Sequence, residues 1–184
     1  MSPAKAKHSK KLVIDASVGR AAGGPEARAP LSKYCRDFLQ VVLDCRHQAV
    51  LPPPLLDEWK KHRSSFAHTW LTRMFSRNKV QLQPVSPDPA LQERLEKTTR
   101  SPGELEALQK DMHLILAALA NDRAVISLDN KMREILRRIG SKQGVLQGLL
   151  WVHPGEVGEE ALSWLKDSCP SKKEWSLSPK PDEG

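Results

Sequence analysis

Four acidic residues stand where a carboxylate could do chemistry. Asp15 directly follows the apolar run 12–14, and Asp129 directly follows the apolar run 124–128. Asp111 and Glu58 lie on or beside the apolar stripes of two expected helices, in segments 101–120 and 54–77. A carboxylate facing inward is costly unless it is paired or bound to a metal. If the fold brings these acids together, they form the oxygen ligand set that hard divalent cations such as Mg²⁺ prefer.

Each acid also has an ordinary structural explanation. An Asp after a buried strand is often a turn former or a helix N-cap, and Asp129 could cap a helix that starts at Asn130. Glu58 could be a solvated helix acid that pairs with Lys61 or His62 nearby. Two strand-end acids in one small domain nevertheless favour a functional site.

Apolar runs that alternate with helix-periodic segments predict the elements that must position these acids. Strands are expected at 11–14, 49–51, 80–85, 124–128 and 149–152, and helices at 31–47, 54–77, 88–98, 101–120, 130–139 and 156–166. Such alternation implies a central parallel sheet with helices on both faces, which is a three-layer α/β/α fold. In such sheets functional residues collect at the carboxyl ends of the strands, so Asp15 and Asp129 should emerge at one edge.

Composition narrows the class of protein. The 184 residues suffice for one domain with a real core. No apolar run approaches the roughly 20 residues that span a bilayer, and none near the N-terminus has the length of a secretory h-region, so we expect a cytoplasmic protein without a membrane partner. Three cysteines without a CxxC pair and six histidines without an HExxH motif argue against a disulfide framework and a zinc hydrolase.

The chain is basic, with 29 Lys and Arg against 22 Asp and Glu and a net charge of +7. An excess of this size suggests a polyanionic partner, of which nucleic acid is the commonest. A basic, solvated surface with no specific partner would give the same count.

Taken together, these segments resemble the PIN-domain ribonuclease family, which includes the VapC-type toxins. The family pattern is an Asp after the first strand, a Glu on a following helix, an Asp near a later helix start and a Ser/Thr-x-Asp after the fourth strand. The resemblance covers about residues 11–153, and it is carried by Leu12-Val-Ile-Asp15-Ala-Ser17, Leu55-Leu-Asp-Glu58-Trp-Lys-Lys, Asp111-Met-His-Leu-Ile-Leu-Ala-Ala-Leu and Ser127-Leu-Asp129. The loop after Asp15 is longer and more basic than the family pattern, and the segment after His153 lies outside the match.

The resemblance implies a metal-dependent endoribonuclease that hydrolyses RNA phosphodiester bonds with Mg²⁺ or Mn²⁺. Asp15, Asp111 and Asp129 would be the metal ligands, and Glu58 would be a further ligand or would orient the attacking water. Arg20, Lys61 and Ser127 are the expected substrate contacts, although Ser127 could instead bond Asp129 or be a buried strand serine that the backbone satisfies. The protein partners that the resemblance suggests are an antitoxin protein and a second copy of the chain. The alternative is a catalytically silent PIN-like domain that binds RNA or a partner protein.

The expected organisation has four parts. Residues 1–10 form a disordered basic N-terminus, and residues 11–153 form the PIN-like nuclease domain. Residues 154–169 form a C-terminal helix packed on that domain. Residues 170–184, which are rich in Pro, Ser and Lys, are expected to be a disordered tail without core residues.

Overall fold

A five-stranded parallel sheet forms the centre of the protein. The structure is a computed structural model, and it describes residues 8–24 and 29–178. The strand order is β3-β2-β1-β4-β5, and all four pairings are parallel. The strands are β1 (Lys11–Ile14), β2 (Gln48–Val50), β3 (Val80–Gln81), β4 (Ala124–Ile126) and β5 (Leu150–Val152).

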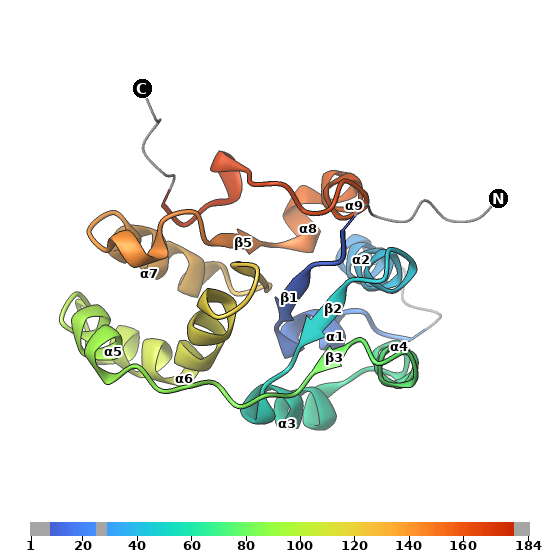
Figure 1. Cartoon of the computed structure of the whole chain (residues 1–184), viewed down its shortest axis with the longest axis horizontal. Coiled ribbons are helices and arrows are strands. Elements are labelled where there is room, and N and C mark those ends of the chain that lie inside the picture. Colours follow the sequence, from blue (N-terminus) through green and yellow to red (C-terminus); the bar gives the residue numbers. More distant parts are fainter. Residues whose placement is uncertain (1–7, 25–28, 179–184) are drawn as a thin grey trace.

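Helices cover both faces of this sheet, which confirms the predicted three-layer α/β/α fold. Helices α5, α6 and α7 lie on one side, and α2, α4 and α9 lie on the other (Figure 1). The helices are α1 (Ala16–Ala21), α2 (Pro30–Asp44), α3 (Pro53–His62), α4 (Ser65–Ser76), α5 (Pro89–Glu96), α6 (Pro102–Leu119), α7 (Asn130–Gly140), α8 (Pro154–Val157) and α9 (Glu159–Lys166), with short 3₁₀ turns at Gly144–Leu146 and Lys173–Trp175. Within the described ranges, no helix is both long and apolar enough to cross a membrane.

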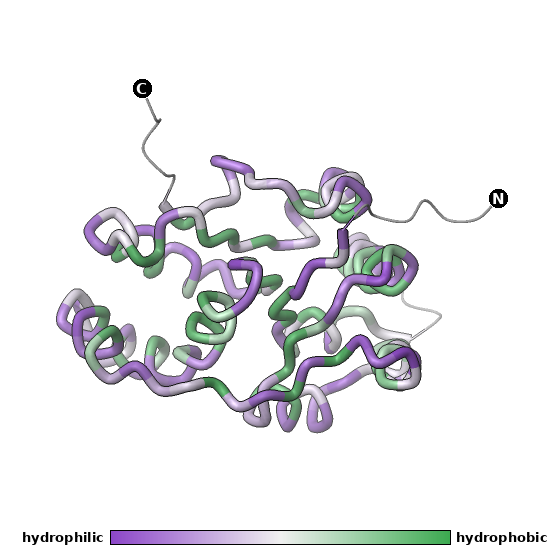
Figure 2. Tube along the Cα trace, in the orientation of Figure 1, coloured by the Kyte–Doolittle hydropathy of each residue, from purple (hydrophilic) through white to green (hydrophobic). Residues whose placement is uncertain are grey.

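The central strands are apolar on both faces because helices cover both. Leu12, Val13 and Ile14 in β1 are fully buried, and so are Val125 and Ile126 in β4. Strands in this position appear in the sequence as continuous apolar runs and not as alternating patterns. Figure 2 shows the same division, with hydrophobic strands inside and hydrophilic outer helix surfaces.

The prediction of one long helix over residues 54–77 is wrong, because two separate helices, α3 and α4, form there. Arg63 is extended (φ −74°, ψ 141°), and Ser64 caps α4 by accepting a hydrogen bond from the Ala67 amide. The Ser64 hydroxyl also donates to the carbonyl of Gly19 at 2.8 Å. A serine that can cap a new helix and bond a distant carbonyl competes with continuation of the old helix.

The strand expected at 80–85 and the helix expected at 156–166 also differ from their predictions. The strand expected at 80–85 pairs only at Val80 and Gln81, because its partner β2 ends at Val50 just before Pro52. The final helix expected at 156–166 is divided into α8 and α9 at Gly158, whose φ of +50° favours glycine. Both helices contact α2, so this segment packs on the domain.

The expectation of a tail without core residues is wrong for the part of the tail that is described. Trp175 and Leu177 are buried, and the Leu177 amide donates to the carbonyl of Leu149 at 2.9 Å. The Trp175 ring meets Trp164 of α9 edge to face, with 5.5 Å between the centroids. These aromatic and apolar groups therefore cover the outer edge of the sheet at β5. Residues 179–184 lie outside the described part.

The N-terminal segment expected to be disordered is attached to the domain at residues 8–10. The Lys10 amide donates to Nδ1 of His47 at 3.0 Å, and the Ser9 hydroxyl donates to the carbonyl of Arg46 at 2.9 Å. Satisfied backbone and side-chain groups of this kind hold the start of β1 in place. Residues 1–7 lie outside the described part.

Gly19 in α1 provides a test of how tightly the end of the sheet is packed. A Cβ atom there would lie 2.6 Å from Cζ3 of Trp59, whose indole is held by a hydrogen bond to Ile14 and by stacking on Trp70. Gly19→Ala should therefore destabilise the fold by about 1–3 kcal/mol in chemical denaturation, the usual range for overpacking. Gly144→Ala is the matched control, because nothing lies within 4 Å of its Cβ position. Equal stability of the two variants would contradict this packing.

Candidate active site

The four predicted acids line one pocket at the carboxyl edge of the sheet. Its volume is about 220 Å³, and it is lined by Asp15, Ser17, Arg20, Glu58, Lys110, Asp111, Leu128 and Asp129. These residues come from the end of β1, from α1, α3 and α6, and from the turn after β4. Because β1 and β4 are adjacent parallel strands, the acids that follow them meet at the same edge.

Asp15 is held in place by its backbone and by two serines. Its amide donates to the carbonyl of Ile126 at 2.9 Å, which continues the pairing of β1 with β4. Its Oδ2 atom accepts hydrogen bonds from the hydroxyls of Ser17 at 2.6 Å and Ser127 at 3.1 Å. A carboxylate has about four lone-pair positions, so Asp15 retains acceptor capacity beyond these two bonds.

Asp129 caps α7, as one interpretation of the sequence expected, and it also lines the pocket. Its Oδ1 atom accepts a hydrogen bond from the Met132 amide at 2.8 Å. The Asp129 amide donates to Oγ of Ser127 at 3.1 Å. The helix cap therefore fixes the direction in which this carboxylate points.

Ser127 does not fit the predicted role of a substrate contact. Its side chain is fully buried, and its hydroxyl is already bonded to Asp15 and to the Asp129 amide. It links the end of β4 to Asp15, which follows β1, and it is not among the described residues that line the pocket.

Asp111 shows most clearly that the four acids act on one another. The pKa of its carboxyl is raised to about 7, mostly by burial in α6 and in part by the negative charges of Asp15 and Asp129, with a smaller contribution from Glu58. Lys110 acts in the opposite direction and lowers it. The pocket therefore has an excess of negative charge that one neighbouring lysine does not balance.

Glu58 is positioned by its neighbour in α3. The indole Nε1 of Trp59 donates to the carbonyl of Ile14 at 2.8 Å, and the ring is fully buried. This bond attaches α3 to the end of β1, beside Asp15, and places Glu58 in the pocket lining. Asp57, the adjacent acid, is exposed and lies outside that lining.

The basic residues divide differently from the prediction. Arg20 lines the pocket as expected, whereas Lys61 is exposed on α3 and is not among the lining residues. Lys110 and Ser17 line the pocket and were given no role from the sequence. Ser17 stands two residues after Asp15, a spacing at which the hydroxyl can reach back to the carboxylate, and Lys110 directly precedes Asp111.

The donor set suits a hard divalent cation by type. The pocket offers four carboxylates and a serine hydroxyl, with neither thiolate nor imidazole, and oxygen ligands of this kind fit Mg²⁺ or Mn²⁺. Across residues 8–24 and 29–178, however, no three His, Cys, Asp or Glu side chains are arranged so that they could hold one ion. Like charges repel in the absence of a cation, so ion binding would require these side chains to move closer together.

Comparison with known proteins assigns no family to this site. No protein-family model matches the chain, and no curated protein sequence matches it.

Proposed function

We propose that the chain is a metal-dependent endoribonuclease of the PIN-domain type. One observation carries this proposal: four acids that are far apart in the sequence line a single pocket at the carboxyl edge of a parallel sheet. Two basic residues, Arg20 and Lys110, line the same pocket and offer contacts to an anionic substrate. That RNA is the substrate, and the family itself, rest on the resemblance of the four motifs.

The residues of the pocket would have different roles in hydrolysis. Asp15, Asp111 and Asp129 would hold Mg²⁺ or Mn²⁺ with Glu58 beside them, and the bound cation would supply an activated water and neutralise charge on the phosphoryl group. Ser17 and Ser127 orient Asp15 through their hydroxyls. Arg20 and Lys110 would bind the non-bridging phosphate oxygens. The attacking water would lose a proton as its oxygen forms the new bond to phosphorus, the bridging P–O bond would break, and the leaving oxygen would take up a proton.

A cleavage assay with and without metal tests this function. Purified protein is incubated with total cellular RNA in Mg²⁺, in Mn²⁺ and in chelator, and the RNA ends are mapped. We expect fragments with discrete ends in the presence of metal and intact RNA in chelator. Intact RNA under all three conditions would contradict the proposal.

One observation favours a second function, a catalytically silent PIN-like domain that binds RNA. The side chains of the described residues offer no ready-made arrangement for a metal ion. In that case RNA would bind without being cut, and adding Mn²⁺ would not change the melting temperature. The assay above and a thermal melt in Mn²⁺ separate the two functions.

The cations beside the acids should control how cleavage depends on salt. Arg20→Ala or Lys110→Ala should lower kcat/KM for a single-stranded RNA about tenfold. Each should also reduce the log–log slope against salt concentration by about 0.7, the contribution of one phosphate contact on a single strand. Lys166→Ala, an exposed cation of α9, is the matched control. An unchanged slope in both pocket variants would mean that these cations are merely solvated.

A further inference from the structure

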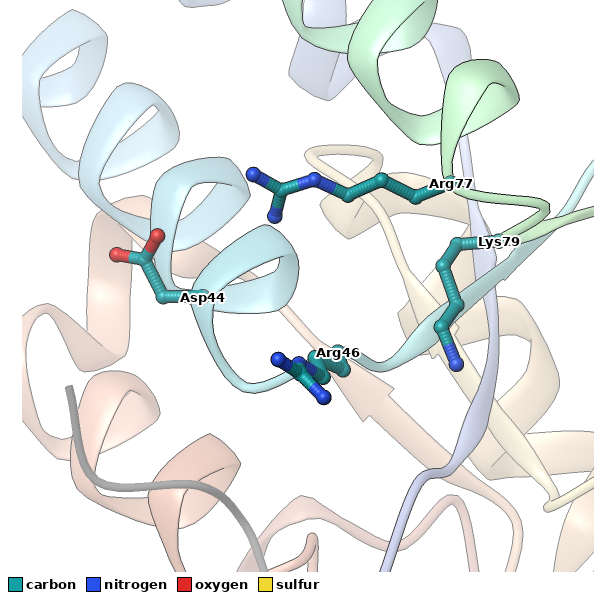
Figure 3. A pocket seen from close by; sticks show the side chains of 4 residues that line it. All are labelled: Asp44, Arg46, Arg77 and Lys79. Carbon is teal, nitrogen blue, oxygen red and sulfur yellow. The ribbon is translucent and has the colours of Figure 1, made fainter. Parts of the chain in front are cut away.

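Cations gather at the opposite edge of the sheet, where the strands begin. A hollow of about 630 Å³ is lined by Asp44, Arg46, Arg77 and Lys79. Arg46 lies two residues before β2, and Lys79 directly precedes β3. Figure 3 shows Arg77 extending from the end of α4 toward the end of α2, where Asp44 lies, with Arg46 and Lys79 along the other side of the hollow.

Backbone pairing extends this group of cations across three strands. The Gln48 amide donates to the carbonyl of Lys10, and the Ala49 amide donates to the carbonyl of Lys79, both at 2.8 Å. The buried ring of His47 accepts a hydrogen bond from the Lys10 amide at 3.0 Å; its pKa is lowered mainly by burial, with contributions from Lys10 and Lys79 that Asp122 opposes. Neighbouring strands lie about 4.8 Å apart, so the strand starts that carry Lys10, Arg46 and Lys79 span roughly 10 Å.

No acid of the described part of the chain forms an ion pair with these cations. Within residues 8–24 and 29–178, the side chains of Lys10, Arg46, Arg77 and Lys79 take part in no ion pair or side-chain hydrogen bond of the structure. Asp44 accepts its hydrogen bond from Gln40 and not from the arginines. Three cations face the hollow with one acid, Asp44, so positive charge is in excess there, and an anionic ligand would relieve the remaining repulsion.

Arg46 occupies a position that glycine would fill more easily. It follows the end of α2 with a φ of +61°, and its amide bonds back to the carbonyl of Leu43. Left-handed residues that end helices in this way are usually Gly, because a Cβ atom makes the conformation unfavourable. The cation is thus present at a conformational cost. A neutral glycine would serve the turn better, so the turn alone does not explain an arginine there.

The chemistry of the hollow selects a class of ligand. The four described residues that line it are all charged, and none of them is an aromatic or apolar residue that could bury a base or an apolar peptide side chain. Arginines bind phosphate oxygens in bidentate fashion, whereas peptide recognition relies on buried apolar anchors. A row of cations across three strands is also longer than one phosphate ion. An extended chain of phosphates fits it best.

We propose that Lys10, Arg46, Arg77 and Lys79, called the basic edge, bind the phosphate backbone of a nucleic acid at the edge of the sheet opposite the acidic pocket. Binding here does not require the nuclease activity proposed above. The contacts are to phosphates and not to base edges, so binding should depend strongly on salt and weakly on sequence.

Binding of a fluorescent oligouridylate, followed by anisotropy in chelator, tests the basic edge without cleavage. Arg77→Glu and Lys79→Glu should each weaken binding about tenfold and lower the salt slope by about 0.7. Asp44→Asn should tighten binding, because it removes the one acid among the described residues that line the hollow and keeps the oxygen that accepts from Gln40. Arg77→Gln should weaken binding less than Arg77→Glu, and it avoids placing an acid at the C-terminus of α4.

Matched controls carry the same charge changes elsewhere. Arg94→Glu on α5 and Glu106→Gln on α6 should leave affinity and slope as in the wild type. Melting temperatures show whether each variant is folded. If Arg77→Glu and Arg77→Gln, both folded, bind as tightly as Arg94→Glu, the basic edge is not a binding site.

Competitors identify the ligand chemistry. A methylphosphonate oligonucleotide, whose backbone is uncharged, should not displace the labelled probe, and an unlabelled oligouridylate should. Displacement by inorganic phosphate at the same phosphorus concentration would mean that the site takes free phosphate, and equal displacement by polyglutamate would mean that it takes acidic peptides. Either result overturns the assignment to a nucleic-acid backbone. Cleavage in metal is measured separately, so failure of this test leaves the nuclease proposal unaffected.

Discussion

Asp111→Asn should lower metal-dependent RNA cleavage by about a thousandfold while the protein remains folded. Asparagine has nearly the same volume but lacks the charge that would hold a cation, and losses of this size follow when one catalytic charge or donor is removed. Asp15→Asn should give the same result, because Asp15 would hold the same cation and its negative charge already acts on Asp111 in the same pocket. The measurement is kcat/KM with Mn²⁺, together with a melting curve for each variant.

Asp57→Asn is the matched control for this experiment. Asp57 lies next to Glu58 on α3, but it is exposed and outside the pocket lining. The charge change is the same, so cleavage by this variant should equal that of the wild type. A folded Asp111→Asn protein with wild-type cleavage and metal dependence would show that the pocket is not the active site.

Without metal, the free energy of unfolding should fall as the pH rises from about 4 to about 7. The folded protein keeps the Asp111 proton up to about pH 7, whereas the unfolded chain releases it near the ordinary pKa of 3.8. Between these values the folded state binds more protons than the unfolded state, so raising the pH favours unfolding. The complete effect is on the order of 2–4 kcal/mol, and the partial exposure of Asp111 places it toward the lower end.

Chemical denaturation in chelator at pH 4 and pH 8 measures this difference. Asp111→Asn should lose most of the pH dependence and should be more stable than the wild type at pH 8, because the buried charge is gone. Asp57→Asn should keep the wild-type profile. Wild-type stability that does not change across this pH range would contradict the burial and charge coupling of Asp111.

A divalent cation should reverse the same destabilisation. A ligand that binds only the folded state adds about 2.7 kcal/mol at one hundred times its dissociation constant. Asp129→Asn should be at least as stable as the wild type in chelator, since asparagine also caps helices and one repelling charge is lost. It should gain less than the wild type from Mn²⁺. If the wild type shows no shift in millimolar Mn²⁺, the catalytically silent function becomes the better explanation.

The local structure of this protein could largely be predicted from its sequence. The apolar runs before Asp15 and Asp129 predicted two central strands, because strands covered on both faces need apolar side chains at every position. The side chains that cap helices could be predicted equally well from the sequence. Asp88 and Ser101 accept hydrogen bonds from the amides of Leu91 and Glu104, three residues on in each case, and they start α5 and α6 where the sequence places them.

Where short-range signals compete, the sequence was a poorer guide. The periodicity of residues 54–77 continues through the break between α3 and α4, and only the bond from Ser64 to the distant carbonyl of Gly19 shows why the helix stops. Trp175 and Leu177 lie in a polar, proline-containing segment, yet they are buried because the edge of the sheet at β5 needs a cover. Neither fact can be read from a local window, since each depends on a partner far along the chain.

The sequence by itself determined which residues could form a site, and the tertiary structure decided which of them meet. Asp15 and Asp129 share an edge only because β4 pairs directly with β1, and Asp111 reaches them only because α6 packs against both strands. The same parallel sheet gathers Lys10, Arg46 and Lys79 at its other edge, where no motif marks them. All strands of a parallel sheet start at one edge and end at the other, so residues distant in sequence converge according to their place along a strand.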